Sequence, residues 1–415
     1  MYTYGSTWQS PYPYHQGMRI ASVLVAFAMT ACLGDVGDES STTGQGGASS
    51  TSTSSSNNTS TGSAGAPPCS AANLSEAVRI SDVAVDGASA SALYAPSPSG
   101  GWAAWAGSDG QVHLTPLDAV DARAGDDLLI EALAPFGLVA SASELSVLVS
   151  RSPDYMTFMR LDTSGNVVAS VDLVGGGNHN NVGTEWFGEF ARTGRLVEQN
   201  PGEYAAYFAL HRRWPDNIGH QGDTLRLLDA SGQPRGGGWD WGCSHSIDQR
   251  IAASAGQLAP ICIADCYPGK GIYFNHDQAQ IIDDPSANCA GGVSTTLGGL
   301  ISSSDGSWLS YAKDGNYRLA KLDGNGQTTV DLELPSAMRH RLATYEGDLL
   351  LAYEDGSGVV LERRDPAGAA IGAAETISGI GLPPEHDLAS LENGDVAWAF
   401  AQGTTLSIVR LRSCD

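Results

Sequence analysis

The chain has 415 residues, of which 51 are glycine and 19 proline, with only 16% charged residues and a formal net charge of −24 at pH 7. Nucleic acids, acidic polysaccharides and anionic lipid headgroups bind positive surfaces, so this charge argues against all three as partners. Abundant glycine and proline with little helical periodicity predict many short strands joined by turns.

The first element along the chain is an apolar segment, residues 20–29, that follows the basic residue Arg19. It is far shorter than the roughly 20 residues that a membrane-spanning helix needs, which indicates a targeting signal. Residues 1–17 are aromatic and proline-containing, unlike the basic start of a signal peptide, so we expect translation to begin at Met18. The sequence therefore predicts a signal peptide within residues 1–31.

The end of this signal, Met-Thr-Ala-Cys at residues 29–32, resembles the lipobox of bacterial lipoproteins, in which a small residue precedes a cysteine that is acylated and becomes the mature N-terminus. Met29 stands where the lipobox usually carries leucine. The resemblance implies that Cys32 is lipidated and anchors the protein to a membrane. In such lipoproteins an aspartate after the cysteine retains the protein at the inner membrane. Leu33 occupies that position here, so the resemblance implies an exported protein in the cell envelope, at the outer membrane or cell surface.

A low-complexity stretch follows, because residues 40–66 contain only Ser, Thr, Gly, Ala, Asn and Gln. Such a segment cannot bury enough apolar surface to offset the entropy of ordering, and it is predicted to be disordered. A flexible chain of this length spans about 30 Å. Residues 32–66 are therefore predicted to be a lipidated cysteine and a linker that tethers a folded domain.

Residues 67–415 are predicted to form that domain, and their most informative feature is internal repetition. Seven units, each with a turn, an apolar strand, a loop and an alternating strand, start about 40 to 60 residues apart, the spacing of four-stranded propeller blades. The segment from 75 to 413 therefore resembles a divergent seven-bladed β-propeller, an all-β fold, without the motifs of WD40 or Kelch repeats. The units are residues 100–118, 143–165, 202–232, 256–275, 306–326, 347–368 and 394–413.

Four units end their second strand with the same Asp-x-x-Gly turn, at residues 162–165, 229–232, 323–326 and 365–368. The aspartate is expected to cap the turn, and the glycine to take the positive φ that returns the chain into the next strand. A calcium loop is the alternative, but these turns lack the dense run of oxygen ligands that calcium requires.

Six cysteines follow Cys32, an even number that predicts disulfides in an exported chain. The first and last of them flank the seven units, so a bond between them would close the ring. Four others lie in and around the fourth unit, where three pairings are open, and a hairpin about residues 255–256 favours one of these. A metal site is the alternative, although the spacing lacks a CxxC motif. The favoured disulfides are Cys69–Cys414, Cys243–Cys266 and Cys262–Cys289.

Unusual side chains gather in four loops of the third and fourth units: GGGNHNN, HRRWPDNIGHQGD, WDWGCSHS and DCYPGK. In a propeller, loops between the second and third strands share one face with the links between blades, so these loops are predicted to meet. Long polar loops on a rigid scaffold often form sites. The candidate ligand-binding residues are His179, His211, His220, Asp223, Trp239, Trp241, His245 and Asp265.

Two kinds of chemistry are open at this face. Trp239 and Trp241 lie two residues apart, so in an extended segment they would project to one side and stack on a sugar or an aromatic ligand. His220, Asp223 and His245 could instead hold a divalent metal or act as acid and base. The alternative for all of them is ordinary packing and capping.

No nucleophile elbow, HExxH motif, P-loop or dinucleotide fingerprint occurs in the sequence, and no cofactor is evident apart from a possible divalent metal. We therefore expect a surface-anchored, monomeric binding or interaction module for a protein or a neutral glycan. The alternative is a secreted lyase or hydrolase with a His/Asp site, metal-dependent or not, on the loops of blades three and four.

Overall fold

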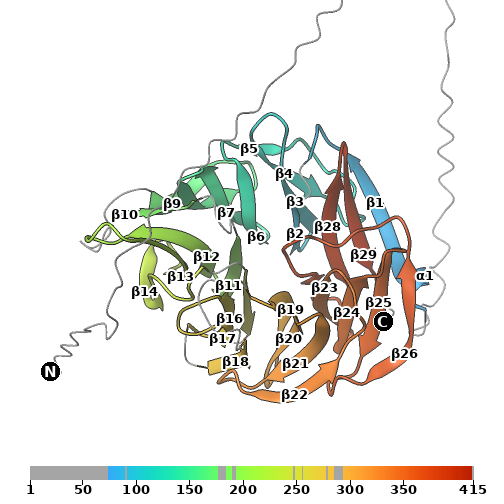
Figure 1. The fold of residues 1–415 in the computed structure, drawn as a ribbon. Coiled ribbons are helices and arrows are strands. Elements are labelled where there is room, and N and C mark those ends of the chain that lie inside the picture. Colours follow the sequence, from blue (N-terminus) through green and yellow to red (C-terminus); the bar gives the residue numbers. More distant parts are fainter. Residues whose placement is uncertain are drawn as a thin grey trace, which may run out of the picture. The chain divides into compact units, whose positions relative to one another are not determined.

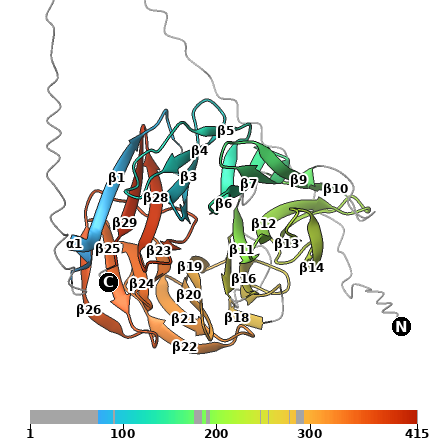
Figure 2. The same ribbon diagram turned by 180° about the vertical axis from the view of Figure 1, so that it is seen from behind.

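The computed structural model describes residues 73–88, 91–175, 184–188, 193–245, 248–254, 256–276, 279–284 and 293–413. Seven antiparallel sheets form a ring, the β-propeller of Figure 1, which Figure 2 shows from behind. This confirms the predicted all-β class and the number of blades. The predictions for the signal peptide, the linker, His179 and the Cys69–Cys414 disulfide lie outside the described residues. Among the described residues, no helix is long and apolar enough to span a membrane.

Each blade runs from an inner to an outer strand. Blade 1 contains β2 (Ala92–Ser97), β3 (Gly100–Ala106), β4 (Val112–Leu117) and β5 (Leu128–Ile130). Blade 2 contains β6 (Ala134–Ala140), β7 (Glu144–Ser152), β8 (Tyr155–Asp162) and β9 (Val167–Gly175). Blade 3 contains β11 (Gly194–Asn200), β12 (Glu203–Arg213), β13 (Gly219–Leu228) and β14 (Pro234–Trp239). Blade 4 contains β15 (Gln249–Ser254), β16 (Gln257–Ala264), β17 (Gly271–Phe274) and β18 (Ala279–Asp283). Blade 5 contains β19 (Thr295–Ser303), β20 (Gly306–Lys313), β21 (Asn316–Leu322) and β22 (Thr328–Glu333). Blade 6 contains β23 (His340–Tyr345), β24 (Asp348–Glu354), β25 (Val359–Arg364) and β26 (Ala370–Ile377).

The seventh blade closes the ring with strands from both ends of the domain. It contains β27 (Ala389–Ser390), β28 (Val396–Gln402) and β29 (Thr405–Leu411), and its outermost strand is β1 (Val78–Ala84) from the start of the domain. The register runs from Val78 opposite Leu411 to Ala84 opposite Thr405. Backbone pairing thus fastens the N-terminal strand to the last blade, a closure that the sequence analysis did not predict.

The seven units recognised in the sequence are the second and third strands of the seven blades. These middle strands are covered on both faces by neighbouring blades, so they are the most apolar, as in β24, where five central residues in succession are buried. The outer strands face solvent, and in β26 none of the eight residues is buried. A strand in contact with water carries no strong hydrophobic pattern, which explains why only the middle hairpins are recognisable.

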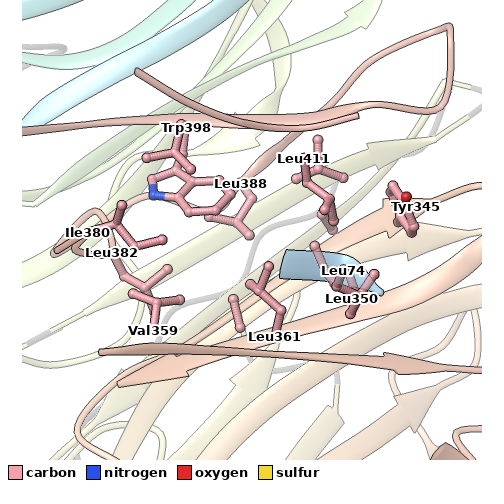
Figure 3. Close-up of a cluster of buried hydrophobic side chains, with 14 of the residues drawn as sticks. Leu74, Tyr345, Leu350, Val359, Leu361, Ile380, Leu382, Leu388, Trp398 and Leu411 are labelled. Carbon is pink, nitrogen blue, oxygen red and sulfur yellow. The ribbon is translucent and has the colours of Figure 1, made fainter. Parts of the chain in front are cut away.

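Most of the hydrophobic core lies between adjacent blades. Figure 3 shows the cluster between blades 6 and 7, where Leu350 and Leu361 of blade 6 lie opposite Trp398 and Leu411 of blade 7. Leu74 of the short helix α1 (Leu74–Ala77) packs into the same cluster. The indole N–H of Trp398 donates a 2.8 Å hydrogen bond to the carbonyl of Gly381, so this large side chain is fully satisfied.

The four Asp-x-x-Gly turns have the predicted geometry. In each, the aspartate Oδ1 accepts hydrogen bonds of 2.8–3.0 Å from the backbone N–H groups two and four residues further on. The four glycines have φ between 77° and 90°. The turn interpretation is therefore confirmed.

Candidate functional site

Backbone hydrogen bonds tie together two loops and the start of strand β13 in blades 3 and 4. The N–H of His245 donates to the carbonyl of Gln221 at 3.0 Å, and the N–H of Ser244 donates to the carbonyl of Tyr267 at 2.8 Å. A weaker bond of 3.3 Å joins the N–H of Asp265 to the carbonyl of Ser244. We call the surface made by residues 214–220, 241–245 and 265–267 the blade 3/4 face.

Two histidines and an aspartate form the polar part of this face. The His245 ring lies 6.5 Å from the His220 ring, centre to centre, and its Nδ1 is 2.8 Å from Oδ1 of Asp265. His245 has a left-handed backbone with φ 46°, a conformation that the bond to Gln221 holds in place. A histidine oriented by a carboxylate keeps its Nε2 available for a ligand, a proton or a metal ion.

A row of three rings forms the apolar part of the blade 3/4 face. Trp241 contacts both other rings: Trp214 lies edge-on to it with ring centres 6.2 Å apart, and Tyr267 lies at 5.7 Å, tilted by 34°. Both tryptophans are partly exposed, and Tyr267 is 47% exposed. The row is built on Gly222, since a Cβ there would collide with the Trp241 indole. The guanidinium of Arg212 lies 5.1 Å from the centre of the Trp214 ring, a cation–π contact.

Asp223 lies in a different environment from the two histidines of this face. It is fully buried, and the hydroxyl of Tyr207 donates a hydrogen bond to its Oδ2. Burial raises the pKa of Asp223 to about 6. Along strand β13, His220 and Asp223 are an odd number of residues apart, so they project to opposite sides, and His220 is exposed.

The candidate metal ligands are therefore not brought together as the sequence predicted. Among the described residues, the carboxylate of Asp223 groups with Cys243 and Cys262, and no group of three ligand atoms within reach of one ion includes either His220 or His245. The two cysteines form a disulfide and offer no thiolate. His220 and His245 lie near each other, with ring centres 6.5 Å apart, and Asp265 lies beside Nδ1 of His245.

The predicted disulfides Cys243–Cys266 and Cys262–Cys289 are wrong, because the structure bonds Cys243 to Cys262, with Cα atoms 6.3 Å apart. Strands β15 and β16 pair as expected, up to Ser254 opposite Gln257, but β15 begins only at Gln249. Cys243 therefore lies outside the ladder of β15 and β16, and it is bonded to Cys262 rather than to Cys266. Cys266 is also disulfide-bonded.

Trp239 and Trp241 do not form the predicted common platform. Strand β14 ends at Trp239, so the chain is no longer extended between them. Trp239 packs edge-on against Tyr207 and His276, at 5.7 Å from each, whereas Trp241 joins the ring row. His211 is buried beside Trp186, at 5.2 Å between ring centres.

Near this site the structure also has a short extra strand on blade 3 that was not predicted from the sequence. Strand β10 (Thr184–Trp186) pairs with the far end of β12. Glu185 at its centre is fully buried and makes ion pairs with Arg212 and with Arg226, the latter at 3.2 Å. No local sequence pattern predicts a pairing between residues this far apart. Trp214 and Tyr267 could have been predicted as site residues from the sequence, since both lie in the loops that were predicted to meet.

No protein-family model matches the chain, and no curated protein sequence matches it. Similar solved structures include the WD40 β-propeller domain of Doa1, with 12% identity, a TM-score of 0.46, and coverage of 79% of this chain and 95% of that one. The Dos1 propeller has 10% identity, a TM-score of 0.43, and coverage of 75% and 76%. A PQQ-bound aldose sugar dehydrogenase from Streptomyces coelicolor has 13% identity, a TM-score of 0.39, and coverage of 80% and 98%. At such values the likeness concerns the fold alone, and the strand pairing described above identifies this chain as a seven-bladed β-propeller.

Proposed function

We propose that the protein is a lipid-anchored binding module of the bacterial cell envelope, and that the blade 3/4 face binds a neutral glycan. The row of rings from Trp214 through Trp241 to the exposed Tyr267, beside the His245–Asp265 pair, carries this proposal. Aromatic faces bind the apolar faces of sugar rings, and neighbouring histidine and carboxylate groups bind the hydroxyls.

The net charge of −24 favours an uncharged ligand over a polyanion. It also favours an exported domain that stays soluble at high local density on a surface. The side chains that carry the proposed contacts are aromatic rings, imidazoles and one carboxylate, a set that discriminates by shape and hydrogen bonding and needs no opposite charge on the ligand.

The anchor is supported by the lipobox-like residues 29–32 and by the linker that follows them. Replacement of Cys32 by Ser in the full-length chain should move the protein from the membrane fraction to the soluble fraction without changing its melting temperature. We expect no change in melting temperature, because the proposed linker stands between the proposed anchor and the propeller in the sequence. A Cys32→Ser protein that stays in the membrane fraction would remove this part of the proposal.

A glycan array tests the ligand directly. The full-length Cys32→Ser protein should bind a subset of neutral glycans, and Tyr267→Ala should reduce that binding about tenfold, because one stacked ring contributes roughly 1 kcal/mol or more. Tyr155→Ala is the matched control, since Tyr155 is a similarly exposed tyrosine (39% against 47%) on blade 2. Equal losses in both variants, or no glycan binding by the parent, would contradict the assignment. A protein partner that is lost with Tyr267→Ala would replace the glycan.

A second candidate function is hydrolysis or lyase chemistry, favoured by the 2.8 Å pair of His245 and Asp265 beside His220. This geometry fits a general base oriented by a carboxylate, or a metal site with two histidines. Addition of Zn²⁺, Mn²⁺ or Ca²⁺ should then raise the melting temperature, and His245→Ala should abolish the rise with little effect on basal stability. No response to any of these ions would remove the metal-dependent form of this candidate.

A further inference from the structure

A buried cluster of one carboxylate and two sulfur atoms lies in the core of blades 3 and 4 and takes no part in the proposed glycan contacts. Asp223 comes from strand β13, Cys243 from the link between the two blades, and Cys262 from strand β16. All three side chains are fully buried. A carboxylate oxygen of Asp223 and the two sulfur atoms lie within 4.8 Å of one another. Three separate elements thus bring three metal-ligand side chains to one point.

The carboxylate of Asp223 is incompletely paired in the oxidised protein. The Tyr207 hydroxyl donates a hydrogen bond to Oδ2, but Oδ1 accepts none from the residues that the structure describes, although the indole N–H of Trp239 is nearby. A Cβ at Gly242, the residue before Cys243, would lie 2.1 Å from Oδ1. The free acceptor therefore faces the segment that carries one of the sulfur atoms. A buried carboxylate is costly unless it is paired or binds a metal ion.

The donor set and its surroundings fit a tetrahedral zinc site. Zn²⁺ binds cysteine thiolates and carboxylate oxygens at about 2.0–2.3 Å, so small rotations of the freed cysteine side chains would bring all three ligand atoms to one ion. The hydrogen bond from Tyr207 to Oδ2 fixes the orientation of the Asp223 carboxylate. The imidazole of His276 stands next to the fourth position, since the Cβ at Gly242 would lie 2.9 Å from its Cδ2. Its Nε2 is 3.2 Å from the carbonyl oxygen of Trp241.

Reduction of the disulfide changes the charge of this cluster in a way that favours a divalent cation. In the oxidised protein the disulfide is neutral, and the ionised carboxylate of Asp223 carries one negative charge. A dithiol that reduces the bond supplies two electrons and two protons, so Cys243 and Cys262 become thiols and the dithiol becomes a cyclic disulfide. Binding of Zn²⁺ then releases both thiol protons. Two thiolates, one carboxylate and Zn²⁺ again carry one net negative charge, the same as in the oxidised form.

We propose that the reduced form of this cluster is a zinc site, in which Cys243, Cys262 and Asp223 bind one Zn²⁺ in place of the disulfide. Thiolates select Zn²⁺ over Mg²⁺, Ca²⁺ and Mn²⁺, which prefer oxygen ligands. The bound ion then holds the link between blades 3 and 4 against strand β16, as the disulfide does in the oxidised protein. This inference does not depend on the proposed function, because the cluster contributes no exposed side chain to the blade 3/4 face.

Cobalt(II) tests the site directly, because its bonds to thiolates absorb in the near ultraviolet and tetrahedral Co²⁺ absorbs in the visible. The chain for this test is full length and keeps only the cysteine pair of the cluster. After reduction by a phosphine in urea and return to buffer, it should bind one Co²⁺ per chain with both absorptions, and Zn²⁺ should displace the cobalt. The oxidised chain should show no thiolate absorption. The substitutions are Cys32→Ser, Cys69→Ser, Cys266→Ser, Cys289→Ser and Cys414→Ser.

A reduced chain that gives no thiolate–cobalt absorption, folded or not, would overturn the proposal. Asp223→Asn in the same chain keeps both cysteines and should weaken Co²⁺ binding about tenfold or more. Asp284→Asn is the matched control, since Asp284 is 3% exposed, bonds the N–H of Ser294 and lies outside the cluster. Equal affinities in these two variants would overturn the role of Asp223. If Asp223→Asn does not refold, the cobalt spectrum of its parent still decides.

Thermal unfolding separates this site from the pair His220 and His245. Zn²⁺ should raise the melting temperature of the reduced chain, because an ion that binds only the folded state stabilises it. His245→Ala should leave this rise unchanged. A rise of equal size in the oxidised and reduced chains that is lost in His245→Ala would assign the ion to the histidine pair and overturn the present assignment.

Discussion

Arg410 and Asp121 are 289 residues apart in the sequence, and they form a two-pronged ion pair that joins the last blade to the first. Nε of Arg410 lies 2.7 Å from Oδ2 of Asp121, and Nη2 lies 2.6 Å from Oδ1. Arg79 of the closing strand β1 donates to the same carboxylate at 2.7 Å. The Asp121 side chain is 1% exposed, so two strands of blade 7 are fastened to one buried anion of blade 1.

The backbone at Asp121 explains why the sequence analysis missed this residue. Residues 118–121 form a fifth copy of the Asp-capped turn, with Asp118 Oδ1 accepting two 2.9 Å bonds from the N–H groups of Val120 and Ala122. Asp121, at the last position of this turn, has φ 60°, and the other four copies have glycine at that position. Aspartate stands here in place of glycine, the residue best suited to that φ, and its carboxylate binds Arg410.

Replacement of Asp121 by Gly separates these two roles. Glycine relieves the left-handed backbone by roughly 1 kcal/mol, but it removes the two-pronged partner of the buried Arg410, which keeps only the 3.2 Å ion pair with Asp395, and this loss costs about 3–5 kcal/mol. We expect a net loss of about 2–4 kcal/mol in the free energy of unfolding, measured by denaturant titration. Arg410→Met should also destabilise the protein, and the double variant should lose less than the sum of the two. Strict additivity would show that the pair is not the closing contact.

Two glycines with the same backbone but different surroundings test the turn geometry. Gly315 and Gly326 have φ of 78° and 77°. Around Gly315 a Cβ would meet nothing within 4 Å, whereas at Gly326 it would lie 2.5 Å from Cγ of Phe274 in the neighbouring blade. Gly315→Ala should therefore cost about 1 kcal/mol from strain alone, and Gly326→Ala about 1–3 kcal/mol more from overpacking. Equal losses of stability in the two variants would show that the blades separate to accommodate the extra methyl group.

The fold was predictable from the sequence because the middle strands of every blade are buried on both faces and therefore carry an apolar pattern. Strand β1 was not predictable, since only Val83 of its seven residues is buried and its partner lies at the other end of the chain. The histidine pair was half predicted. His220 and His245 were chosen from loops that do meet, but Asp265 rather than Asp223 lies beside His245, because strand alternation turns Asp223 into the core.

Three buried arginines at the start of inner strands, Arg195, Arg250 and Arg341, were also predictable in part. The inner strands of blades 3, 4 and 6 share a pattern in which arginine precedes two apolar residues, at 195–197, 250–252 and 341–343. An arginine at a strand start is usually exposed, so the pattern alone gives no reason to bury it. Only closure of the ring brings the three side chains to one level of the channel.

The Cys243–Cys262 disulfide closes a loop of 19 residues, for which the chain-entropy model predicts about 3 kcal/mol of stabilisation. Cys243→Ser, Cys262→Ser and the double variant should lose similar amounts of stability, because each removes the same bond. Peptide mapping without reduction should recover Cys243 and Cys262 in one linked species. Recovery of Cys243 linked to Cys266 would reinstate the pairing expected from the sequence.

His340 should make the protein sensitive to mild acid. It begins strand β23 and is 3% exposed, with its ring packed against Tyr317 at 4.8 Å and Tyr353 at 5.5 Å between centres. Burial, aided by the neighbouring charge of Arg341, lowers the pKa of His340 from its usual 6.5 to about 4. The native protein therefore holds this imidazole uncharged under conditions where the unfolded chain protonates it.

The sign of the effect follows from proton uptake. Above pH 6.5 neither state is protonated at His340, and its full contribution to stability is present. Between pH 6.5 and 4 the unfolded chain binds the proton first, so the contribution is lost as the pH falls, by about 3 kcal/mol in total. Asp223 acts in the opposite direction, because its pKa is raised to about 6, and it favours the folded state as the pH falls.

The two groups are separated by comparison with His340→Phe, which keeps a ring between Tyr317 and Tyr353 and cannot be protonated. The free energy of unfolding of this variant, measured by urea titration at several pH values, should fall less than that of the parent between pH 6.5 and 4. The difference between the two curves should grow by about 1.4 kcal/mol per pH unit in that window and stay constant above it. Parallel curves down to pH 4 would mean that His340 becomes protonated in the folded protein at its ordinary pKa.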